Sequence, residues 1–476
     1  MSSAAFQGQE WDSIRKFHPE ILIEKVTSPS SNHSSSSSPS TSPSSESSSA
    51  EYTSSCLETL SSSFESPKDY FSHIREDEHP LVAVVGVGYV GFHLVSAFSK
   101  CYKVIAFDVS DKRLTTVAEQ LPDTANIHFT SDASCLAGAT HFLVAVPTPL
   151  LPGTTEIDTS IIQSALDTIC GQARRGSTIV IESSVSVGMT RNLLGKMVQE
   201  YGLRAGMSPE RVDPGRIDPP FESIAKIISG LDDLAPNSLN YIHKLYSRVF
   251  KHLVTVSSPE VAEMTKLYEN CQRMICIAYA NEMADACQEL LTPIDPFEVC
   301  RAAATKPFGY IPFSPSAGVG GHCIPVNPSY LFKTSGFPLL RHATEKMSRR
   351  PAELADRTMR TLLQRGTDST SESMNRKRKV LVVGIAFKPG QALITNSPGV
   401  RIINHLLDSW DAHVSFADPL VKEHALTYVP RLDEKVEWNQ KKLCQFDAII
   451  VVIKQVQLNF DVLNELKGVL IEKYCQ

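Results

Sequence analysis

The feature that most constrains the fold is a glycine-rich turn between an apolar run and a helical pattern. Residues 81–85 (LVAVV) form a continuous apolar run of the kind expected of a buried parallel strand. They lead into GVGYVG at 86–91, a GxGxxG turn, and then into apolar residues at helical spacing from Leu94 to Phe98. A GxGxxG turn in this context is typical of a dinucleotide-binding fold. The sequence therefore predicts an N-terminal Rossmann domain in an α/β protein.

The second predicted strand, 103–107, indicates which dinucleotide is bound. It ends at Asp108, where an acidic residue of this fold accepts hydrogen bonds from the adenosine ribose. That carboxylate would repel a 2′-phosphate, so the predicted cofactor is NAD. Arg113 is the residue here that speaks against this choice, but it could as well lie along the adenosine edge. Backbone N–H groups at the helix N-terminus are expected to hold the pyrophosphate. The cofactor-binding residues predicted in this turn are Gly86, Gly88, Tyr89, Val90 and Gly91.

Two further apolar runs, 141–146 and 177–182, extend the predicted parallel sheet. In an open α/β sheet the carboxyl ends of the strands line the ligand crevice. Thr148, Glu182 and Ser184 lie at these ends and are expected to face the cofactor, although each is equally compatible with a solvated loop.

A loop at 318–328, GVGGHCIPVNP, places a cysteine between glycines and prolines. Glycine permits positive φ or a close approach of the backbone to a ligand, and proline stiffens the backbone beside it. Cys323 is therefore either a reachable thiol or, like most cysteines, a small buried apolar residue. A Cys-His hydrolase built on His322 and Cys323 is disfavoured, because adjacent residues of an extended segment point to opposite sides.

A long helix is predicted from Ser258 to about Leu291. Ser258 is a favourable N-cap residue, Pro259 is a favourable first residue, and apolar residues follow at helical spacing. Lys266 and Asn270 are four positions apart, so they share one face of the helix. A lysine on a helix is usually solvated, but this pairing ahead of the cysteine loop makes Lys266 a candidate site residue. A helix of this length also suits a homodimer interface.

The chain divides into five predicted segments. Residues 1–78 are a tail, rich in serine and proline, that lacks the apolar residues needed to fold and is expected to be disordered. The tail is either dispensable or a phosphorylated regulatory arm. The other predicted segments are a NAD-binding Rossmann domain (79–256), a central helical domain with the cysteine loop (257–365), a linker (366–379) and a C-terminal Rossmann-like domain (380–476).

Composition excludes several classes of function. A net charge of −6 and a pI near 6.2 argue against a nucleic-acid binder that works through a basic surface. The eleven cysteines are scattered without CxxC pairs, so they are expected to be reduced thiols of a cytoplasmic protein, and no metal site is predicted. No signal peptide is evident, and no apolar run of about 18 residues suggests a membrane segment.

Six motifs, taken in order, resemble the UDP-glucose/GDP-mannose dehydrogenase family. The resemblance covers about residues 80–420, and its wording is most similar to members that oxidise UDP-N-acetylhexosamines to uronic acids. The motifs are GVGYVG at 86–91, VAVPTP at 144–149, SPERVDPG at 208–215, AEMTKLYEN at 262–270, GVGGHCIPVNP at 318–328 and VGIAFKP at 383–389.

The resemblance implies a catalytic mechanism. A family member oxidises the C6 alcohol of a UDP-sugar by four electrons with two NAD, through a thiohemiacetal and a thioester on Cys323. It implies that Lys266 and Asn270 stabilise the oxyanion at C6 and that Thr148 and Glu210 position or deprotonate water and the alcohol. It implies a C-terminal domain that binds the UDP-sugar. The substrate-binding residues implied are Glu210, Arg211, Lys266, Phe308, Gly309, Tyr310, Ile311, Gly320 and Lys388.

The sequence also departs from the family. Asn327 stands where an aspartate is usual, and an amide cannot act as a base in thioester hydrolysis, so slow hydrolysis is predicted. Residues 391–396 (QALITN) replace the usual acidic residues and arginine, which predicts the loss of a cofactor contact. Residues 454–476 do not resemble the usual closing strand.

These departures keep a second hypothesis open. The chain is either a nucleotide-sugar 6-dehydrogenase or a non-catalytic relative that binds NAD and a nucleotide sugar. A two-electron β-hydroxyacid-type dehydrogenase shares the Rossmann domain followed by helices, but it leaves the Cys323 loop and the C-terminal domain unexplained.

Overall fold

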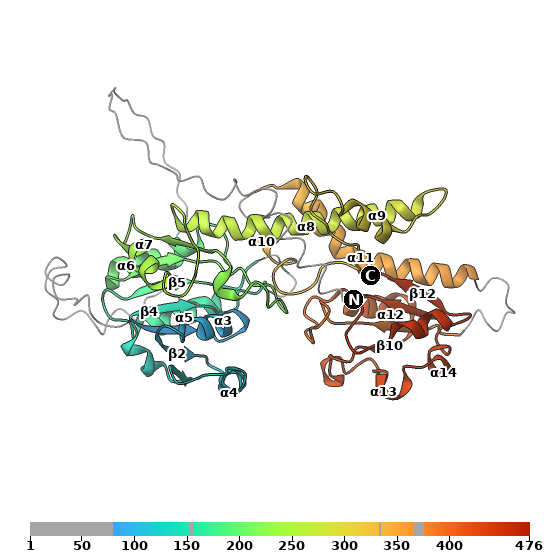
Figure 1. Ribbon diagram of the computed structural model, residues 1–476, viewed down its shortest axis with the longest axis horizontal. Coiled ribbons are helices and arrows are strands. Elements are labelled where there is room, and N and C mark those ends of the chain that lie inside the picture. Colours follow the sequence, from blue (N-terminus) through green and yellow to red (C-terminus); the bar gives the residue numbers. More distant parts are fainter. Residues whose placement is uncertain (1–79, 152–153, 155, 333–334, 366–375) are drawn as a thin grey trace, which may run out of the picture. The chain divides into compact units, whose positions relative to one another are not determined.

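The computed structural model of the chain describes residues 80–151, 154, 156–332, 335–365 and 376–476. The predicted tail and residues 366–375 of the predicted linker lie outside the described residues. The described part is mixed α/β, with one eight-stranded and one four-stranded sheet (Figure 1). The predicted fold class is therefore confirmed.

The larger sheet has the strand order β3-β2-β1-β4-β5-β6-β7-β8, and its first six strands are parallel in the Rossmann order. Strand β7 pairs antiparallel with β6 and parallel with β8. The strands are β1 (Leu81–Val85), β2 (Lys103–Phe107), β3 (Ile127–Thr130), β4 (His141–Val144), β5 (Thr178–Ile181), β6 (Arg204–Met207), β7 (Lys226–Gly230) and β8 (Leu253–Thr255).

This sheet is buried on both faces, as its continuous apolar strands predict. In β1, Ala83 and Val85 belong to one apolar cluster, whereas Val82 and Val84 belong to another. The alternation arises because successive side chains of a strand point to opposite faces. The covering helices are α3 (Tyr89–Phe98), α4 (Asp111–Gln120), α5 (Ser160–Cys170), α6 (Met189–Tyr201) and α7 (Ser238–Tyr246).

The central region is helical, as predicted. Helix α8 (Pro259–Glu289) is 31 residues long, with Pro259 in its first turn. Ser258 occupies the N-cap position, as predicted, although its side chain makes no capping hydrogen bond to the backbone. The other helices are α9 (Pro296–Ala303), α10 (Asn327–Phe332) and α11 (Pro338–Arg365), and α10 and α11 both pack on α8.

The C-terminal sheet has the order β10-β9-β11-β12, with all strands parallel. The predicted strands are present as β9 (Lys379–Val383), β10 (His413–Ala417) and β11 (Ala448–Val451). The expectation that the chain end lacks a closing strand is wrong, since β12 (Leu470–Lys473) pairs with β11. The sequence pattern does not reveal this short strand, because its polar residues, Glu472 and Lys473, hide the apolar ones. The remaining helices are α12 (Pro398–Trp410), α13 (Glu434–Glu437) and α14 (Gln440–Leu443).

Among the described helices, none combines the length and the hydropathy that a membrane span requires.

Candidate active site

The glycine turn after β1 has the shape that a dinucleotide needs. Gly86 has a φ of +87°, which favours glycine, and a Cβ on Gly91 would lie 2.0 Å from the Gly86 oxygen. These two glycines let helix α3 pack tightly against the turn. A Cβ on Gly88, the N-cap residue of α3, would meet no atom within 4 Å, which leaves open space at the helix N-terminus. A pyrophosphate fits this position.

Asp108 lies at the end of β2, beside the glycine turn. Its Oδ2 accepts a 2.8 Å hydrogen bond from the backbone N–H of Val87, and its Oδ1 accepts one from Ser110. Arg113 donates through Nε to the Val87 carbonyl at 2.6 Å. Asp108 and Arg113 are thus both hydrogen-bonded to the glycine turn, beside which they were predicted to lie. The residues present fit NAD.

Tyr89 and Val90 begin helix α3, next to the turn. The Tyr89 hydroxyl donates to the Asp213 carbonyl at 3.3 Å, which joins this helix to the loop that carries Glu210. Burial, followed by the nearby Asp213 carboxylate, raises the pKa of Tyr89 to about 12, so the phenol stays protonated.

Thr148 is held from two sides. Its hydroxyl donates to the Ser184 carbonyl at 2.7 Å, so two predicted cofactor-facing residues do come together. The hydroxyl of Tyr330, from α10, donates to the Thr148 carbonyl at 2.6 Å and lies 3.2 Å from its Oγ1. Tyr330 thereby joins the helix after the cysteine loop to the turn after β4. Sequence reasoning missed Tyr330, which offered no signal beyond its closeness to the cysteine motif.

Glu182 does not face the cofactor, so that prediction is wrong. It is fully buried, its Oε2 accepts from Lys226 Nζ at 2.5 Å, and its Oε1 accepts from the Tyr246 hydroxyl at 2.5 Å. Burial raises the pKa of Glu182 despite the adjacent ammonium. Lys226 also donates to the carbonyls of Ser208 and Pro209, at 3.3 Å each. The Glu182–Lys226 pair therefore supports the loop that carries Glu210.

Glu210 and Lys266 form a buried ion pair at the centre of the site. Lys266 Nζ lies 3.1 Å from Glu210 Oε2, and Lys266 and Glu210 are only 5% and 4% exposed. The other carboxylate oxygen of Glu210 accepts from the Val212 backbone N–H. A lysine buried on the inner face of α8 is uncommon, which sets it apart from a solvated helix lysine.

Asn270 lies one turn beyond Lys266 and contacts the end of the cysteine loop. Its amide Nδ2 donates to Asn327 Oδ1 at 2.5 Å, and both residues are buried. Asn327 also donates its backbone N–H to the Cys323 carbonyl at 2.9 Å. The predicted residues Lys266, Asn270 and Asn327 therefore gather around the loop that carries Cys323.

Cys323 is half-buried, and its electrostatic surroundings are mixed. Burial raises the pKa of its thiol, the carboxylates of Glu210 and Asp213 raise it further, and Lys266 and Arg273 lower it. The resting residue is consequently a thiol at neutral pH, and a base is needed to make it a nucleophile. Glu210 is the carboxylate with the larger influence on this thiol.

This environment predicts how pH affects the reactivity of Cys323. In the free protein, the rate of alkylation by iodoacetamide should still rise above about pH 9, because only the thiolate reacts. Glu210→Gln removes a charge that raises the pKa, so alkylation at about pH 8 should quicken, by about tenfold for each unit of pKa lost. Lys266→Met should slow it. Mass spectrometry of the Cys323 peptide measures both rates, and a slower reaction in Glu210→Gln would contradict the assignment.

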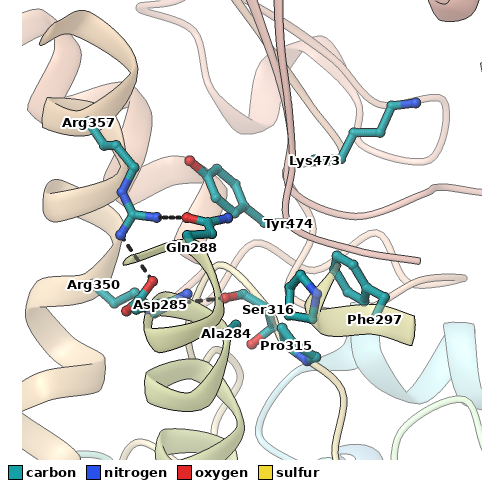
Figure 2. A pocket seen from close by; sticks show the side chains of 11 residues that line it. Ala284, Asp285, Gln288, Phe297, Pro315, Ser316, Arg350, Arg357, Lys473 and Tyr474 are labelled. Carbon is teal, nitrogen blue, oxygen red and sulfur yellow. Dashed lines mark hydrogen bonds and ion pairs between the residues drawn. The ribbon is translucent and has the colours of Figure 1, made fainter. Parts of the chain in front are cut away.

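The segment just before the cysteine loop is fixed by α8 and α11 through Ser316. Asn281, fully buried on α8, accepts the Ser316 backbone N–H through Oδ1 at 2.7 Å. Arg350 of α11 donates to the Ser316 carbonyl at 3.0 Å and pairs with Asp285 at 2.6 Å. Figure 2 shows Arg350 and Arg357 converging on Asp285, with Ser316 beside them. Burial raises the pKa of Asp285, but the two arginines outweigh it and hold that pKa below its usual value.

A small cavity adjoins this cluster, and none of the predicted site residues lines it (Figure 2). Its walls come from α8, α9, α11 and the end of β12, including Phe297, Lys473 and Tyr474. It is therefore separate from the cluster around Cys323.

The middle of the loop lies against the C-terminal domain. A Cβ on Gly320 would lie 2.9 Å from the Cβ of Phe387, so this glycine serves close packing rather than an open substrate site. Lys388, predicted to approach the substrate, pairs with Asp213 at 2.9 Å and donates to the Pro214 carbonyl. The Lys388 side chain thus contacts the loop that carries Glu210.

The structure gives the other predicted substrate residues partners or surroundings of their own. Arg211 pairs with Glu269 of α8 at 2.7 Å and donates to the Ala225 carbonyl. In the segment of Phe308, Gly309, Tyr310 and Ile311, Phe308 is 62% and Ile311 44% exposed. Lys306 lies over the Phe308 ring. Within the described residues, no group of three or more His, Cys, Asp or Glu is arranged to hold a metal ion.

Three profiles of the UDP-glucose/GDP-mannose dehydrogenase family match the chain. The NAD binding domain matches residues 81–250, the central domain 260–342 and the UDP binding domain 381–472.

Individual relatives match across most of their length. UDP-N-acetyl-D-glucosamine 6-dehydrogenase of Pseudomonas aeruginosa is 30% identical over 371 residues, covering 71% of this chain and 83% of that protein. The protein CapL of Staphylococcus aureus is 31% identical over 348 residues, covering 68% of this chain and 79% of that protein. The structure of UDP-D-ManNAc dehydrogenase from Pyrococcus horikoshii superposes with a TM-score of 0.69 at 24% identity, covering 83% of this chain and 99% of that one.

Proposed function

Since this chain belongs to the UDP-glucose/GDP-mannose dehydrogenase family, we propose that it is an NAD-dependent nucleotide-sugar 6-dehydrogenase. The substrate class is a UDP-N-acetylhexosamine or UDP-glucose, and the product is the corresponding uronic acid. The observation that carries the proposal is the convergence of Cys323, the Glu210–Lys266 pair and the Asn270–Asn327 pair. A nucleophile, a carboxylate and preorganised donors are the parts that this oxidation needs.

The residues serve successive bond changes at C6. NAD supplies the hydride acceptor, one molecule for each two-electron step. Glu210 takes the proton of the C6 alcohol, and Lys266 and Asn270 stabilise the negative charge that develops on the oxygen. After Glu210 has passed this proton to solvent, it takes the proton of the Cys323 thiol, and the thiolate forms a C–S bond to the aldehyde carbon. The resulting thiohemiacetal loses its hydroxyl proton and the second hydride to become a thioester. Water held near Thr148 and Glu210 adds to this carbonyl, the C–S bond breaks, and the carboxylate leaves.

The decisive experiment measures how many molecules of NADH are formed for each molecule of UDP-sugar consumed. UDP-GlcNAc, UDP-ManNAc, UDP-GalNAc and UDP-glucose are each tested with the full chain. Two NADH per sugar on one of them is expected. A protein that binds NAD but forms no NADH with any of these sugars would be the non-catalytic relative instead. The buried Lys266–Glu210 pair favours catalysis, because it places opposite charges beside the thiol.

Asn327 predicts which step limits the rate. The Asn327→Asp variant retains an acceptor for Asn270 Nδ2 and adds a carboxylate next to the loop. If thioester hydrolysis is slow for want of a base, kcat should rise by about tenfold, toward the range that general bases contribute. Rapid-quench analysis should show less protein-bound thioester. Asn404→Asp, on α12, is the matched control. An unchanged kcat would remove residue 327 from the hydrolytic step.

We also propose that the protein is a homodimer that uses α8. Several apolar side chains of this helix are exposed: Tyr268 by 73%, Tyr279 by 58% and Met283 by 44%. Met283→Glu combined with Tyr279→Glu should halve the mass measured by light scattering. Leu363→Glu, on the exposed side of α11, should leave the mass unchanged. A monomeric unmodified chain would contradict the proposal.

The proposed domain division remains 79–256, 257–365 and 380–476, with a linker at 366–379 and a tail at 1–78. The three matched family domains lie inside these limits. We propose a cytoplasmic location, in keeping with the reduced cysteines and a nucleotide-sugar substrate.

A further inference from the structure

A turn of the C-terminal domain binds both backbone polar groups of one glycine in the cysteine loop. The Gly321 N–H donates to the Thr395 carbonyl at 2.9 Å, and Asn396 Nδ2 donates to the Gly321 carbonyl at 3.0 Å. Gly321 precedes Cys323 by two residues. The orientation of this peptide therefore helps to set where the Cys323 side chain points.

The turn itself is firmly held. It runs from Ile394 to Ser397 and is closed by a 3.1 Å hydrogen bond from the Ser397 N–H to the Ile394 carbonyl. Asn396, its third residue, has a φ of 51°, a left-handed conformation that asparagine tolerates better than most residues. Ser397 is buried, donates to the Ile385 carbonyl at 2.6 Å and caps helix α12. The Asn396 amide thus projects from a fixed point.

Two glycines of the loop lie close against the C-terminal domain. Gly321 has a φ of +89°, and a Cβ there would lie 3.1 Å from the Phe387 ring. A Cβ on Gly320 would lie 3.3 Å from the Asn396 carbonyl. Because the backbones are this close, a lost or reversed hydrogen bond at Gly321 must be relieved by movement of the loop.

We propose that Asn396 is a positioning residue, whose amide orients the Gly321 peptide and thereby aims the Cys323 thiol at the substrate carbon. The inference rests on the proposed function only in taking Cys323 as the nucleophile. It also gives a role to a segment that departs from the family sequence. An acidic residue at position 396 could not donate to the Gly321 carbonyl, whereas the asparagine does.

Two variants separate the donated hydrogen bond from the turn. Asn396→Asp keeps the shape of the side chain but faces the Gly321 carbonyl with a carboxylate. Asn396→Gly keeps the left-handed turn and removes the donor. We expect kcat with the UDP-sugar to fall by about tenfold in the first and by about threefold in the second, with KM for NAD unchanged, since a small misplacement of a reacting group slows chemistry strongly.

A second readout does not depend on turnover. The rate of Cys323 alkylation by iodoacetamide, measured without NAD or UDP-sugar, should change by at least about threefold in Asn396→Asp while Tm is preserved. Asn404→Asp, in the same domain, should match the unmodified protein in both assays. Normal alkylation and kcat in Asn396→Asp, or an Asn396→Gly variant that behaves as the unmodified protein, would overturn the proposal. If the unmodified protein oxidises no UDP-sugar, the proposed function fails, but the alkylation rates still decide the role of Asn396.

Discussion

The Cys323→Ser variant is expected to lose uronic acid formation by about a thousandfold or more, because the serine hydroxyl is a far weaker nucleophile toward the intermediate aldehyde. The first oxidation does not need the thiol, so any remaining NADH should accompany aldehyde rather than carboxylate. Chromatography with mass spectrometry of the UDP-sugar products distinguishes the two.

The control for this variant is Cys444→Ser, which alters an exposed cysteine of the C-terminal domain. It should keep full activity, and both variants should bind NAD as the unmodified protein does, because the glycine turn and Asp108 are untouched. Undiminished carboxylate output from Cys323→Ser would remove the covalent mechanism.

The Lys226→Met variant should lose about 3–5 kcal/mol of unfolding free energy, the usual effect of removing one member of a buried ion pair. Glu182, which is fully buried, would be left without a counter-ion. Burial already raises the pKa of Glu182 in the intact protein, and the loss of the ammonium would raise it more. An acid whose pKa is raised by folding destabilises the fold above its unfolded pKa, so the defect should be larger at about pH 8 than at about pH 5.

Urea unfolding at the two pH values measures this effect. Glu182→Gln combined with Lys226→Met removes both charges and should recover part of the loss. Lys100→Met breaks an exposed pair with Glu222 and should change stability by less than about 1 kcal/mol. A Lys226→Met variant no less stable than Lys100→Met would show that the buried pair does not hold the loop of Glu210.

The cofactor site is predictable from the sequence, because local patterns determine it. The strand, the glycine turn and Asp108 are close together in the chain, and their geometry follows from backbone constraints that the residue types reveal. The long helix is predictable for the same reason, since Pro259 and the apolar spacing are local signals. The resemblance of the motifs to those of the family indicated which residues around Cys323 are candidates for the active site.

The buried polar supports were not predictable in this way. Glu182 at the end of a strand resembles a crevice residue, and only the antiparallel strand β7 brings Lys226 against it. Likewise, nothing near Asn396 in the sequence indicates Gly321, which lies 75 residues earlier. Contacts of this kind depend on tertiary packing between distant segments, which one sequence does not display.

Helix α8 also sets the distance between the two ends of the segment that carries Cys323. Asn270 contacts Asn327, and Asn281 contacts Ser316, so the helix holds the loop at both ends. The two asparagines are about three full turns apart, so they share one face and lie about 16 Å apart along the axis. The loop between its two anchored residues could span about 36 Å if extended. The excess length has to fold back on the helix, because Val319, Ile324 and Val326 pack in the same apolar cluster as Leu267 and Met274 of α8. Cys323 is therefore held half-buried within the electrostatic reach of Lys266.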